Sequence, residues 1–465
     1  MREVTAHVMA VKPPTPAPLD PGFRPAVLAN REYVQAARAS ARAVPAVLGL
    51  EREAGLLSRY ETVVDPAAPD TFRYIERIVK FLLWARGGWR VYFGGPASIG
   101  EQLRRCYAPG GGRGFDFELM GRVYEKPLEV VVTRPEEVPA EREQSAAVGG
   151  HLDGCRIGFD LGASDYKVAA VQDGACVYSE EFPWDPRTQK DPAYHFDHLM
   201  SGLKKAAAHL PRVDAIGGSS AGVIIKNQIM VASLFRSVPP SIYAQQVQPI
   251  FRRVAEAWGV PVEVANDGDV TALAGAMSLG ANAMLGIAMG SSQAAGYLDA
   301  QGRILGWLNE LAFAPVDVNP EAAADEWSGD RGVGAQYFSQ QAVNKLLPAA
   351  GLSFPKELGL PERLKAVQEL MAKGDDRAKK IYETIGVYLG YAIPHYAEFY
   401  DYRHMLVLGR VTSGQGGDVV MAEARRILAR EFPGIAERIA IHVPDEKSRR
   451  VGQAVAAASL PAREK

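Results

Sequence analysis

Asp160 follows an apolar run and precedes a turn of small residues, within residues 155–171 (CRIGFDLGASDYKVAAV). Gly162 would let backbone N–H groups approach an anion closely, and Ser164 and Lys167 would add donors. Asp160, fixed at a strand end, could orient a metal-bound water. This order of elements predicts a hairpin that wraps a phosphate. An ordinary hairpin with Asp and Gly at its turn is the alternative interpretation of this stretch alone.

Two later segments add matching chemistry. In VPVEVANDGDVTALAGAM a short strand delivers Asn266 and Asp267 to the start of a helix. Asn-Asp-Gly at a helix start is also good capping chemistry, so Asp267 could serve only as a cap. The segment MLGIAMGSSQAAGYLDAQG predicts a strand, a turn at Gly290, Ser291 and Ser292, and a second strand. It repeats the geometry of the first hairpin and predicts a duplicated half-fold.

Strands alternate with helices along the rest of the chain, which predicts an α/β fold. A Gly-rich turn near residue 95 could hold a phosphate or simply turn the corner of an α/β unit. The predicted helices cover 29–57, 70–85, 194–209, 243–258 and 375–402, the last interrupted near Pro394. Helices are also expected to start near 98 and after 414, and further strands to cover 91–93, 128–132, 177–182 and 404–408.

The composition excludes several classes of protein. The chain has 465 residues with a net charge of −2, so it has no electrostatic footprint for nucleic acid or an anionic membrane surface. No apolar run approaches the roughly 20 residues of a spanning helix, and the Pro-rich start lacks a signal-peptide core. Its 3 cysteines are too few and scattered for a disulfide framework. A cytoplasmic protein without a membrane partner is expected.

Four motifs in order resemble the ROK family of sugar kinases and repressors, within the sugar kinase, actin and chaperone ATPase superfamily. DLGASDYKVAAV resembles the first phosphate motif, VEVANDGDVTALAGAM the catalytic segment, and LGIAMGSSQAAGYLDAQGRILG the second phosphate hairpin. LVLGRVTSGQGGD resembles the strand and turn near the nucleotide base, and WLNELAFAPV stands where the family has a Gly-Glu-x-Gly-His segment. The likeness runs from about residue 157 to residue 457.

The resemblance implies two ribonuclease-H-like domains of actin/hexokinase type around a cleft, with an additional N-terminal α/β region. The expected divisions are a flexible Pro-rich lead (1–28), an accessory N-terminal α/β domain (29–135), a linker (136–154), a first kinase-like domain (155–275) and a second (276–465).

The resemblance also implies roles for particular residues. Asp267 would be the catalytic base, and Asp160 would reach Mg²⁺ through water. Asn266 and Glu310 would bind sugar hydroxyls, and Ser233 stands where a sugar-binding Asn is usual. ATP phosphates would be held by both hairpins and by the later turn, at Asp160, Gly162, Ser164, Lys167, Gly290, Ser291, Ser292, Gly409, Ser413 and Gly414.

The departures from the family pattern concern the substrate side and the zinc site. Phe313 replaces a zinc-binding His, and no Cys follows Cys176, so no zinc is expected. The loop over 325–336 must then be held by packing and hydrogen bonds, with Asp330 and Arg331 as candidates or as a solvated ion pair. Gly and Asp at 268–269 replace Ala-Asn, and the second hairpin turn loses its Gly-Thr-Gly. These changes favour a nucleotide-binding protein with an altered substrate.

The leading hypothesis is ATP-dependent phosphorylation of a hydroxyl on a sugar or related polyol, by a homodimer. The alternative is a non-catalytic sugar or nucleotide sensor, or a transcriptional regulator. DNA binding by residues 1–150 is not favoured, because arginines are dispersed there without a basic stripe. An accessory domain that covers the cleft or makes an oligomer contact is preferred for this region.

Overall fold

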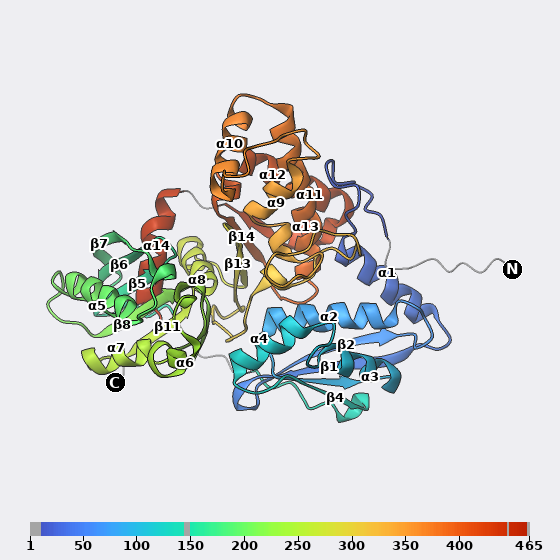
Figure 1. The fold of residues 1–465 in the computed structure, drawn as a ribbon, viewed down its shortest axis with the longest axis horizontal. Coiled ribbons are helices and arrows are strands. Elements are labelled where there is room, and N and C mark those ends of the chain that lie inside the picture. Colours follow the sequence, from blue (N-terminus) through green and yellow to red (C-terminus); the bar gives the residue numbers. More distant parts are fainter. Residues whose placement is uncertain (1–10, 144–148, 444–445, 463–465) are drawn as a thin grey trace.

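The computed structural model describes residues 11–143, 149–443 and 446–462, with only the backbone of 446–451. Three bodies make up the fold (Figure 1): an N-terminal domain, coloured blue to cyan, a first lobe in green, and a second lobe in yellow to red. Each body has its own sheet, and a two-stranded ribbon adds to the first lobe.

The N-terminal domain is a four-stranded sheet in the order β2-β1-β3-β4. Its strands are β1 (Val44–Glu51), β2 (Leu57–Val64), β3 (Arg90–Gly94) and β4 (Glu129–Thr133), and its helices are α1 (Ala26–Ala39), α2 (Thr71–Arg86), α3 (Ala97–Cys106) and α4 (Gly114–Tyr124). This region therefore contains both strands and helices. The helix predicted over 29–57 is wrong in its second half, because the apolar run that continues it pairs with β2 and β3.

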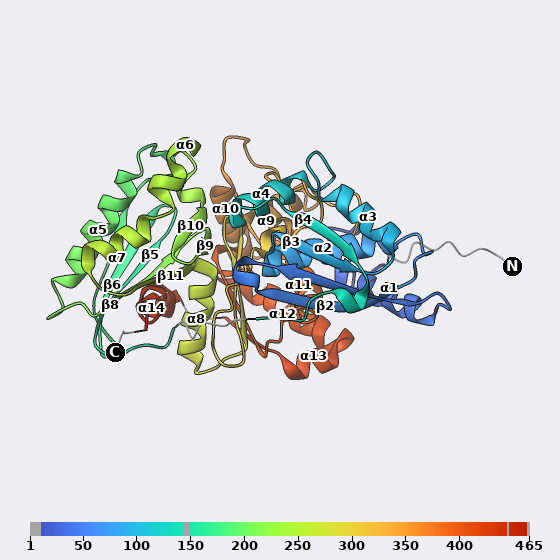
Figure 2. The same cartoon turned by 90° about the horizontal axis from the view of Figure 1, so that it is seen from below.

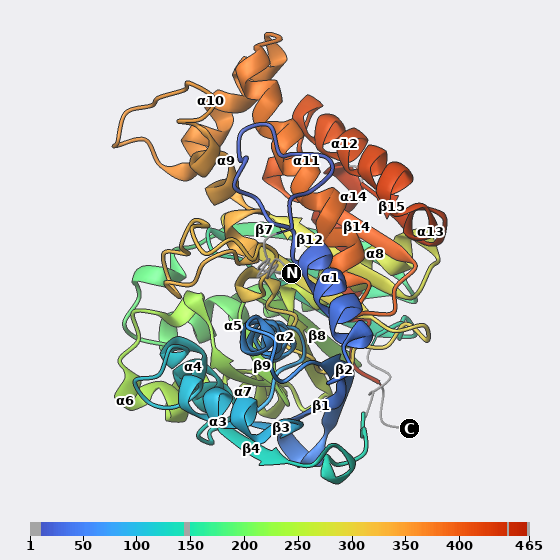
Figure 3. The same cartoon turned by 90° about the vertical axis from the view of Figure 1, so that its right-hand side faces the viewer.

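Residues 11–25 are not the flexible lead that the sequence predicts. Phe23 is buried and stacks edge-on against Tyr388 of α11, with ring centroids 4.7 Å apart. The backbone N–H of Thr15 donates to the Tyr391 hydroxyl at 3.1 Å, and that of Leu19 to Thr384 Oγ1 at 3.2 Å. This segment therefore crosses the second lobe (Figure 3), and residues 1–10 lie outside the described part.

The first lobe is a five-stranded sheet in the order β11-β8-β5-β6-β7. Its strands are β5 (Cys155–Leu161), β6 (Asp165–Gln172), β7 (Ala175–Pro183), β8 (Ala215–Ser220) and β11 (Val262–Asn266). Helices α5 (Ala193–Ala207) and α7 (Ile250–Trp258) belong to it, and β9 (Val223–Ile225) and β10 (Gln228–Val231) form the extra ribbon. The single helix predicted over 243–258 is wrong: a π-helical turn at Tyr243–Val247 is separated from α7 by Pro249.

The second lobe repeats this strand order without a third hairpin strand, as β13-β12-β14-β15. The strands are β12 (Met284–Met289), β13 (Gln293–Leu298), β14 (His404–Leu408) and β15 (Ala440–His442). Its helices are α9 (Gln340–Leu346), α10 (Leu360–Ala372), α11 (Asp376–Tyr396), α12 (Gln415–Glu431) and α13 (Pro433–Arg438). The antiparallel hairpin followed by parallel strands in both lobes matches the predicted duplication. Helix α11 ends at Tyr396, soon after Pro394, and not at 402.

Two helices join the lobes: α8 (Asp267–Leu279) and α14 (Glu446–Ala458). Figure 2 shows α14 end-on beside the green sheet and α8. A Cβ at Gly158 or Gly217 would lie 1.7 Å from the carbonyl oxygens of Ala454 and Ala457, so only glycine allows this helix to dock. The predicted second domain of 276–465 is therefore wrong at its end, because α14 packs on the first lobe.

Candidate functional site

A cleft of about 570 Å³ lies where the two lobes and the N-terminal domain meet. It brings together eight of the predicted site residues: Gly162, Ser233, Asn266, Asp267, Gly290, Ser291, Ser292 and Glu310. The other six lie outside its lining: Asp160, Ser164 and Lys167 in the first hairpin, and Gly409, Ser413 and Gly414 before α12. Both hairpin turns thus face one cleft, although far apart in sequence.

Asn266, and not Asp267, is the cap of α8. The Asn266 side chain accepts a hydrogen bond from the Gly268 N–H at 2.8 Å and donates to the Gly222 carbonyl at 2.8 Å. This leaves Asp267 in the first turn of the helix, lining the cleft. Gly268 is required because a Cβ there would lie 2.0 Å from the Ala295 carbonyl of β13. The departure at 268 therefore lets the helix start pack directly on the second hairpin.

Three carboxyl groups cluster at the start of α8 and in the segment before Leu311. Burial, with the charge of Asp160, raises the pKa of Asp267 to about 6. Burial, with the charges of Asp267 and Asp269, raises the pKa of Glu310 to about 8. Burial also raises the pKa of Asp269 to about 7. At neutral pH, Asp267 is therefore mostly a carboxylate and Glu310 mostly a neutral carboxyl that can donate a hydrogen bond.

The C-terminus of α2, in the N-terminal domain, holds Glu310 in place. The backbone N–H groups of Asn309 and Glu310 donate to the carbonyls of Ala85 and Trp84, each at 2.9 Å. Asn309 has a left-handed φ of 52°. Its side chain donates to Asp269 Oδ1 at 2.8 Å. The last carbonyls of α2 have no partner within the helix and accept these hydrogen bonds instead, so the N-terminal domain forms part of the site.

Asp160 lies behind the cleft, buried in β5. Its Oδ1 accepts a hydrogen bond from Ser219 at 2.7 Å, and its Oδ2 is 4.0 Å from Lys167 Nζ, directly across the hairpin. Lys167 also lies 3.2 Å from Asp165 Oδ1. Burial raises the pKa of Asp160, against the pull of Ser219 and Lys167. The predicted acid and lysine of the first hairpin are therefore cross-strand partners.

Trp184 stabilises the first hairpin turn through two hydrogen bonds. The indole N–H donates to the Gly162 carbonyl at 2.9 Å, and the Trp184 backbone N–H donates to the Ser164 carbonyl at 3.1 Å. The Gly162 N–H closes its own turn on the Asp165 carbonyl, and the Gly290 N–H does the same on Ser292, each at 3.0 Å. Each turn thus has its own closing hydrogen bond, which leaves the residues at its tip to meet a ligand.

Aromatic side chains form one wall of the cleft, which the sequence did not predict. Trp84 of α2 packs on Phe313 with ring centroids 4.4 Å apart. Trp327 meets Phe313 edge-on at 5.3 Å and is 61% exposed. Phe313, which stands where the resemblance would place a zinc-binding His, therefore packs in this aromatic wall.

The loop that contains Trp327 is tied to the N-terminal domain by buried charges. Asp330 pairs with Lys80 of α2 and with Arg113, and Lys80 also lies 2.8 Å from Asp116. Burial alone would raise the pKa of Asp330, but the charges of Lys80, Arg113 and Arg77 outweigh it and lower the pKa. The expected solvated pair of Asp330 with Arg331 is thus wrong, since Arg331 donates to the Ala322 carbonyl instead.

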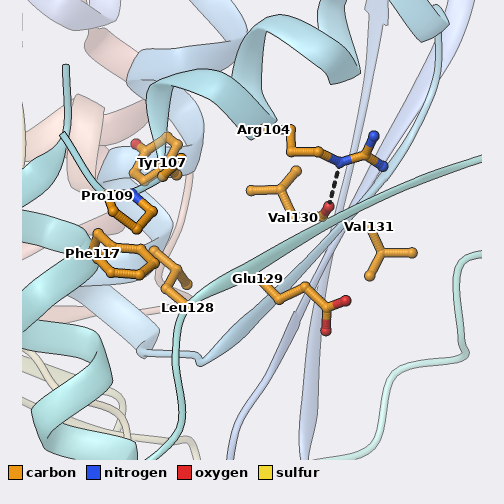
Figure 4. Close-up of a pocket in the computed structure, with 9 residues that line it drawn as sticks. Arg104, Tyr107, Pro109, Phe117, Leu128, Glu129, Val130 and Val131 are labelled. Atoms are coloured by element: carbon orange, nitrogen blue, oxygen red, sulfur yellow. Dashed lines mark hydrogen bonds between the residues drawn. The ribbon is translucent and has the colours of Figure 1, made fainter. Parts of the chain in front are cut away.

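A second hollow lies at the outer edge of the N-terminal sheet (Figure 4). It is lined by the edge strand β4 and by Leu128 before it, by Phe117 of α4, and by Tyr107 directly after α3. Arg104 Nε donates to the Val130 carbonyl at 3.2 Å, which covers part of the exposed strand edge. Its lining contains none of the predicted site residues and a single acid, Glu129, so we do not assign it chemistry.

Three further features of the described residues concern possible groups of metal ligands, helices that could span a membrane, and the state of the cysteines. Within residues 11–143, 149–443 and 446–462, no group of three or more His, Cys, Asp or Glu side chains is arranged to hold a metal ion. In the same ranges, no helix is both long and apolar enough to cross a bilayer. The three cysteines are free and lie on separate elements.

The acid cluster predicts an unusual pH dependence of stability. A carboxyl whose pKa is raised by folding stabilises the protein fully below its unfolded value, and this stabilisation is lost as pH rises through the folded value. For Glu310, the loss runs from about pH 4.5 to about pH 8. We expect the melting temperature to fall over this window, and that of Glu310→Gln to fall less. Parallel curves for both proteins, followed by scanning calorimetry, would contradict the assignment.

Solved structures of other proteins share the fold of the two lobes. No protein-family model and no curated protein matches the chain. Among solved structures, a ROK hexokinase from Thermus thermophilus is 18% identical with a TM-score of 0.52, over 66% of this chain and 97% of that one. A ROK family transcriptional regulator, homologous to the E. coli MLC protein, is also 18% identical with a TM-score of 0.53, over 66% and 79%.

A ROK family glucokinase from Streptomyces griseus, solved with glucose and AMPPNP, is 19% identical with a TM-score of 0.50, over 66% and 98%. The two repeated sheets around a cleft thus define a duplicated α/β fold. More narrowly, about two thirds of the chain has the fold of ROK family kinases and regulators. The remaining third is additional to that fold. Because both kinases and a regulator share it, the fold does not decide the activity.

Proposed function

We propose that this protein transfers the γ-phosphoryl group of ATP to a hydroxyl of a sugar or related polyol. The observation that carries the proposal is the position of Asp267, which lines the cleft beside the Gly290 turn while Asn266 takes over the capping of α8. A carboxylate that is not needed as a cap, with a pKa of about 6, is suited to accept a proton near neutral pH.

In the proposed reaction, Asp267 accepts the proton of the acceptor hydroxyl as its oxygen attacks the γ-phosphorus. The bond from that phosphorus to the β,γ-bridging oxygen breaks, and ADP leaves with the electron pair. Neutral Glu310 and the amide of Asn266 would orient the hydroxyls, with Ser233 opposite on the first lobe. The tips of the hairpin turns, at Ala163, Ser291 and Ser292, would hold the phosphates.

The residues present fit a magnesium ion that arrives with the nucleotide. Asp160 uses one oxygen on Ser219, and its charge contributes to the raised pKa of Asp267, so a cation near both would be stabilised. Mg²⁺ in kinases is held by one or two carboxylates, water and phosphates, and Asp160 would bind it through water. When bound, the ion offsets charge on the transferred phosphoryl group.

The test is a transfer assay on the full chain. The protein is incubated with ATP, Mg²⁺ and a panel of hexoses, amino sugars, sugar acids and polyols, and ADP release and phosphorylated product are both measured. We expect acceptor-dependent ADP release for at least one class. Binding of nucleotide and polyol without any product would overturn catalysis and favour a sensor that keeps the cleft.

A DNA-binding regulator is the second candidate, because a regulator shares the fold. The N-terminal domain argues against it, since its helix α2 is committed to the cleft through Trp84 and to the second lobe through Asn309 and Glu310. Retarded migration of DNA on addition of the full chain, sensitive to a polyol ligand, would reverse this ranking. A homodimer stays a prediction.

A further inference from the structure

Two arginines, Arg187 and Arg236, line the cleft from the first lobe. Across the described part of the chain, neither guanidinium lies within ion-pair distance of a carboxylate. The Nε of Arg187 is also buried there without a hydrogen-bond partner. A buried donor left unpaired costs about 1–3 kcal/mol, so a ligand that accepts a hydrogen bond from Arg187 would be stabilised. Arg236 is exposed and is free to turn toward the same ligand.

The two arginines stand on adjoining turns that are fastened together. Ser237, next to Arg236, donates its hydroxyl to the Arg187 carbonyl at 2.5 Å. The His195 Nε2 lies 3.1 Å from both the Pro186 and the Leu234 carbonyls, which joins the same two turns from behind. His195 is buried and its aromatic neighbour Phe235 stacks on it at 4.2 Å. The guanidinium pair therefore rests on a rigid base.

The sequence position of Arg236 favours the acceptor as the ligand of the pair. Arg236 follows Ser233, the residue proposed to face the acceptor, by three residues, and the phosphate turn at Gly290 lies on the other lobe. The first hairpin turn, at Gly162 and Ala163, lies on the same lobe as the arginines, so the effect of the arginines on ATP binding is measured as well. Guanidinium groups pair with carboxylate and phosphate oxygens in a bidentate manner, and such charge-assisted bonds are stronger than neutral ones.

The contrast with the acid cluster supports the same assignment. Asp267 lies in the cleft and is mostly a carboxylate at neutral pH, so an anionic group close to it would be repelled. An acceptor with a hydroxyl at one end and an anionic group at the other would satisfy both regions. The exposed Trp327 adds an aromatic surface for the carbon skeleton between them.

We infer that the acceptor is an anionic polyol, carrying a carboxylate or a phosphate monoester that Arg187 and Arg236 bind. The inference rests on the proposed function only in calling this ligand the acceptor, because binding of such a compound does not require phosphoryl transfer. The shared chemistry is a polyhydroxylated chain or ring with one anionic group.

Isothermal titration of the full chain without nucleotide tests the inference. The probes are matched sets: neutral hexoses, the corresponding hexuronates and aldonates, and the hexose 6-phosphates. We expect at least one anionic compound to bind tenfold or more tightly than its neutral parent. Preference for the carboxylates or for the phosphates identifies the source of the anion. Equal affinity for charged and neutral members, or binding of no anionic member, overturns the inference.

Arg187→Gln and Arg236→Gln should each weaken binding of the anionic compound by about ten- to a hundredfold and leave binding of its neutral parent unchanged. Arg252→Gln is the matched control, because Arg252 is an exposed residue of α7 that lies 3.8 Å from Glu256. If the two variants weaken binding of ATP and not of the acceptor, the arginine pair binds the nucleotide and the inference fails. Transfer to a neutral polyol would retain the proposed function but overturn the inference. Tight binding of the anionic compound without phosphoryl transfer would support the inference but overturn the proposed function.

Discussion

Replacement of Asp267 by Asn is expected to lower the turnover number for the acceptor by about 10²–10⁴-fold, with little change in nucleotide affinity. The amide keeps the size of the side chain and can still accept the Gly268 N–H at 3.0 Å, so α8 should start at the same residue. What is lost is a group that can take a proton. A steady-state assay with the best acceptor, together with nucleotide titration, measures both quantities.

The pH profile separates this role from a structural one. In the native protein, turnover should rise about tenfold per pH unit up to pH 6 and then level off, because Asp267 must be ionised and its pKa is about 6. The Asp267→Asn variant should lack this acidic limb. Asp197→Asn, on the exposed face of α5, is the control that changes an acid outside the cleft. If Asp267→Asn keeps its turnover within a few-fold of the native protein, Asp267 takes no part in the chemistry.

The sequence predicted the repeated elements well because local patterns specify them. Each hairpin has an apolar strand, a turn with glycine and a second apolar strand, and both appear at the predicted residues. The start of α8 was also predictable, since Asn-Asp-Gly after a strand signals a helix start. The same pattern could not tell which residue caps. That depends on Gly222 and Ala295, which are distant in sequence.

What the sequence did not reveal is the part of the cleft built by residues outside the recognised motifs. Trp84 of α2 and Leu119 of α4 belong to helices whose apolar faces look like ordinary core, and only the tertiary structure places them at the cleft. The arginines of the first lobe lie in short irregular turns without periodicity. Lys80 offered the one available signal, as a charge in the middle of the apolar run of α2. Its partners at 116 and 330 could not be known.

Replacement of Lys80 by Met is expected to lower the free energy of unfolding by about 3–5 kcal/mol, because it leaves the buried carboxylate of Asp116 without its cation and removes one of the cations that pair with Asp330. The Lys80 side chain is 0% exposed and that of Asp116 is 1% exposed. Asp116 Oδ1 also accepts the Trp84 indole N–H at 2.5 Å, so the damage should reach the wall of the cleft. Urea unfolding monitored by tryptophan fluorescence measures the loss.

The ion network around Lys80 lies where the resemblance would place a zinc-bound loop, so the same variant tests how that loop is held. Asp330 would keep Arg113 but lose Lys80, and the neighbouring Trp327 should become more mobile and more accessible to acrylamide. Lys379→Gln is the control, since its exposed pair with Glu383 is worth only about 0.3–0.5 kcal/mol. A double variant, Lys80→Met with Asp116→Asn, should recover part of the stability because it removes the carboxylate that Lys80→Met leaves without a cation. If Lys80→Met costs no more than the control, the buried charges do not hold the loop, and aromatic packing of Phe313 on Trp84 must do so instead.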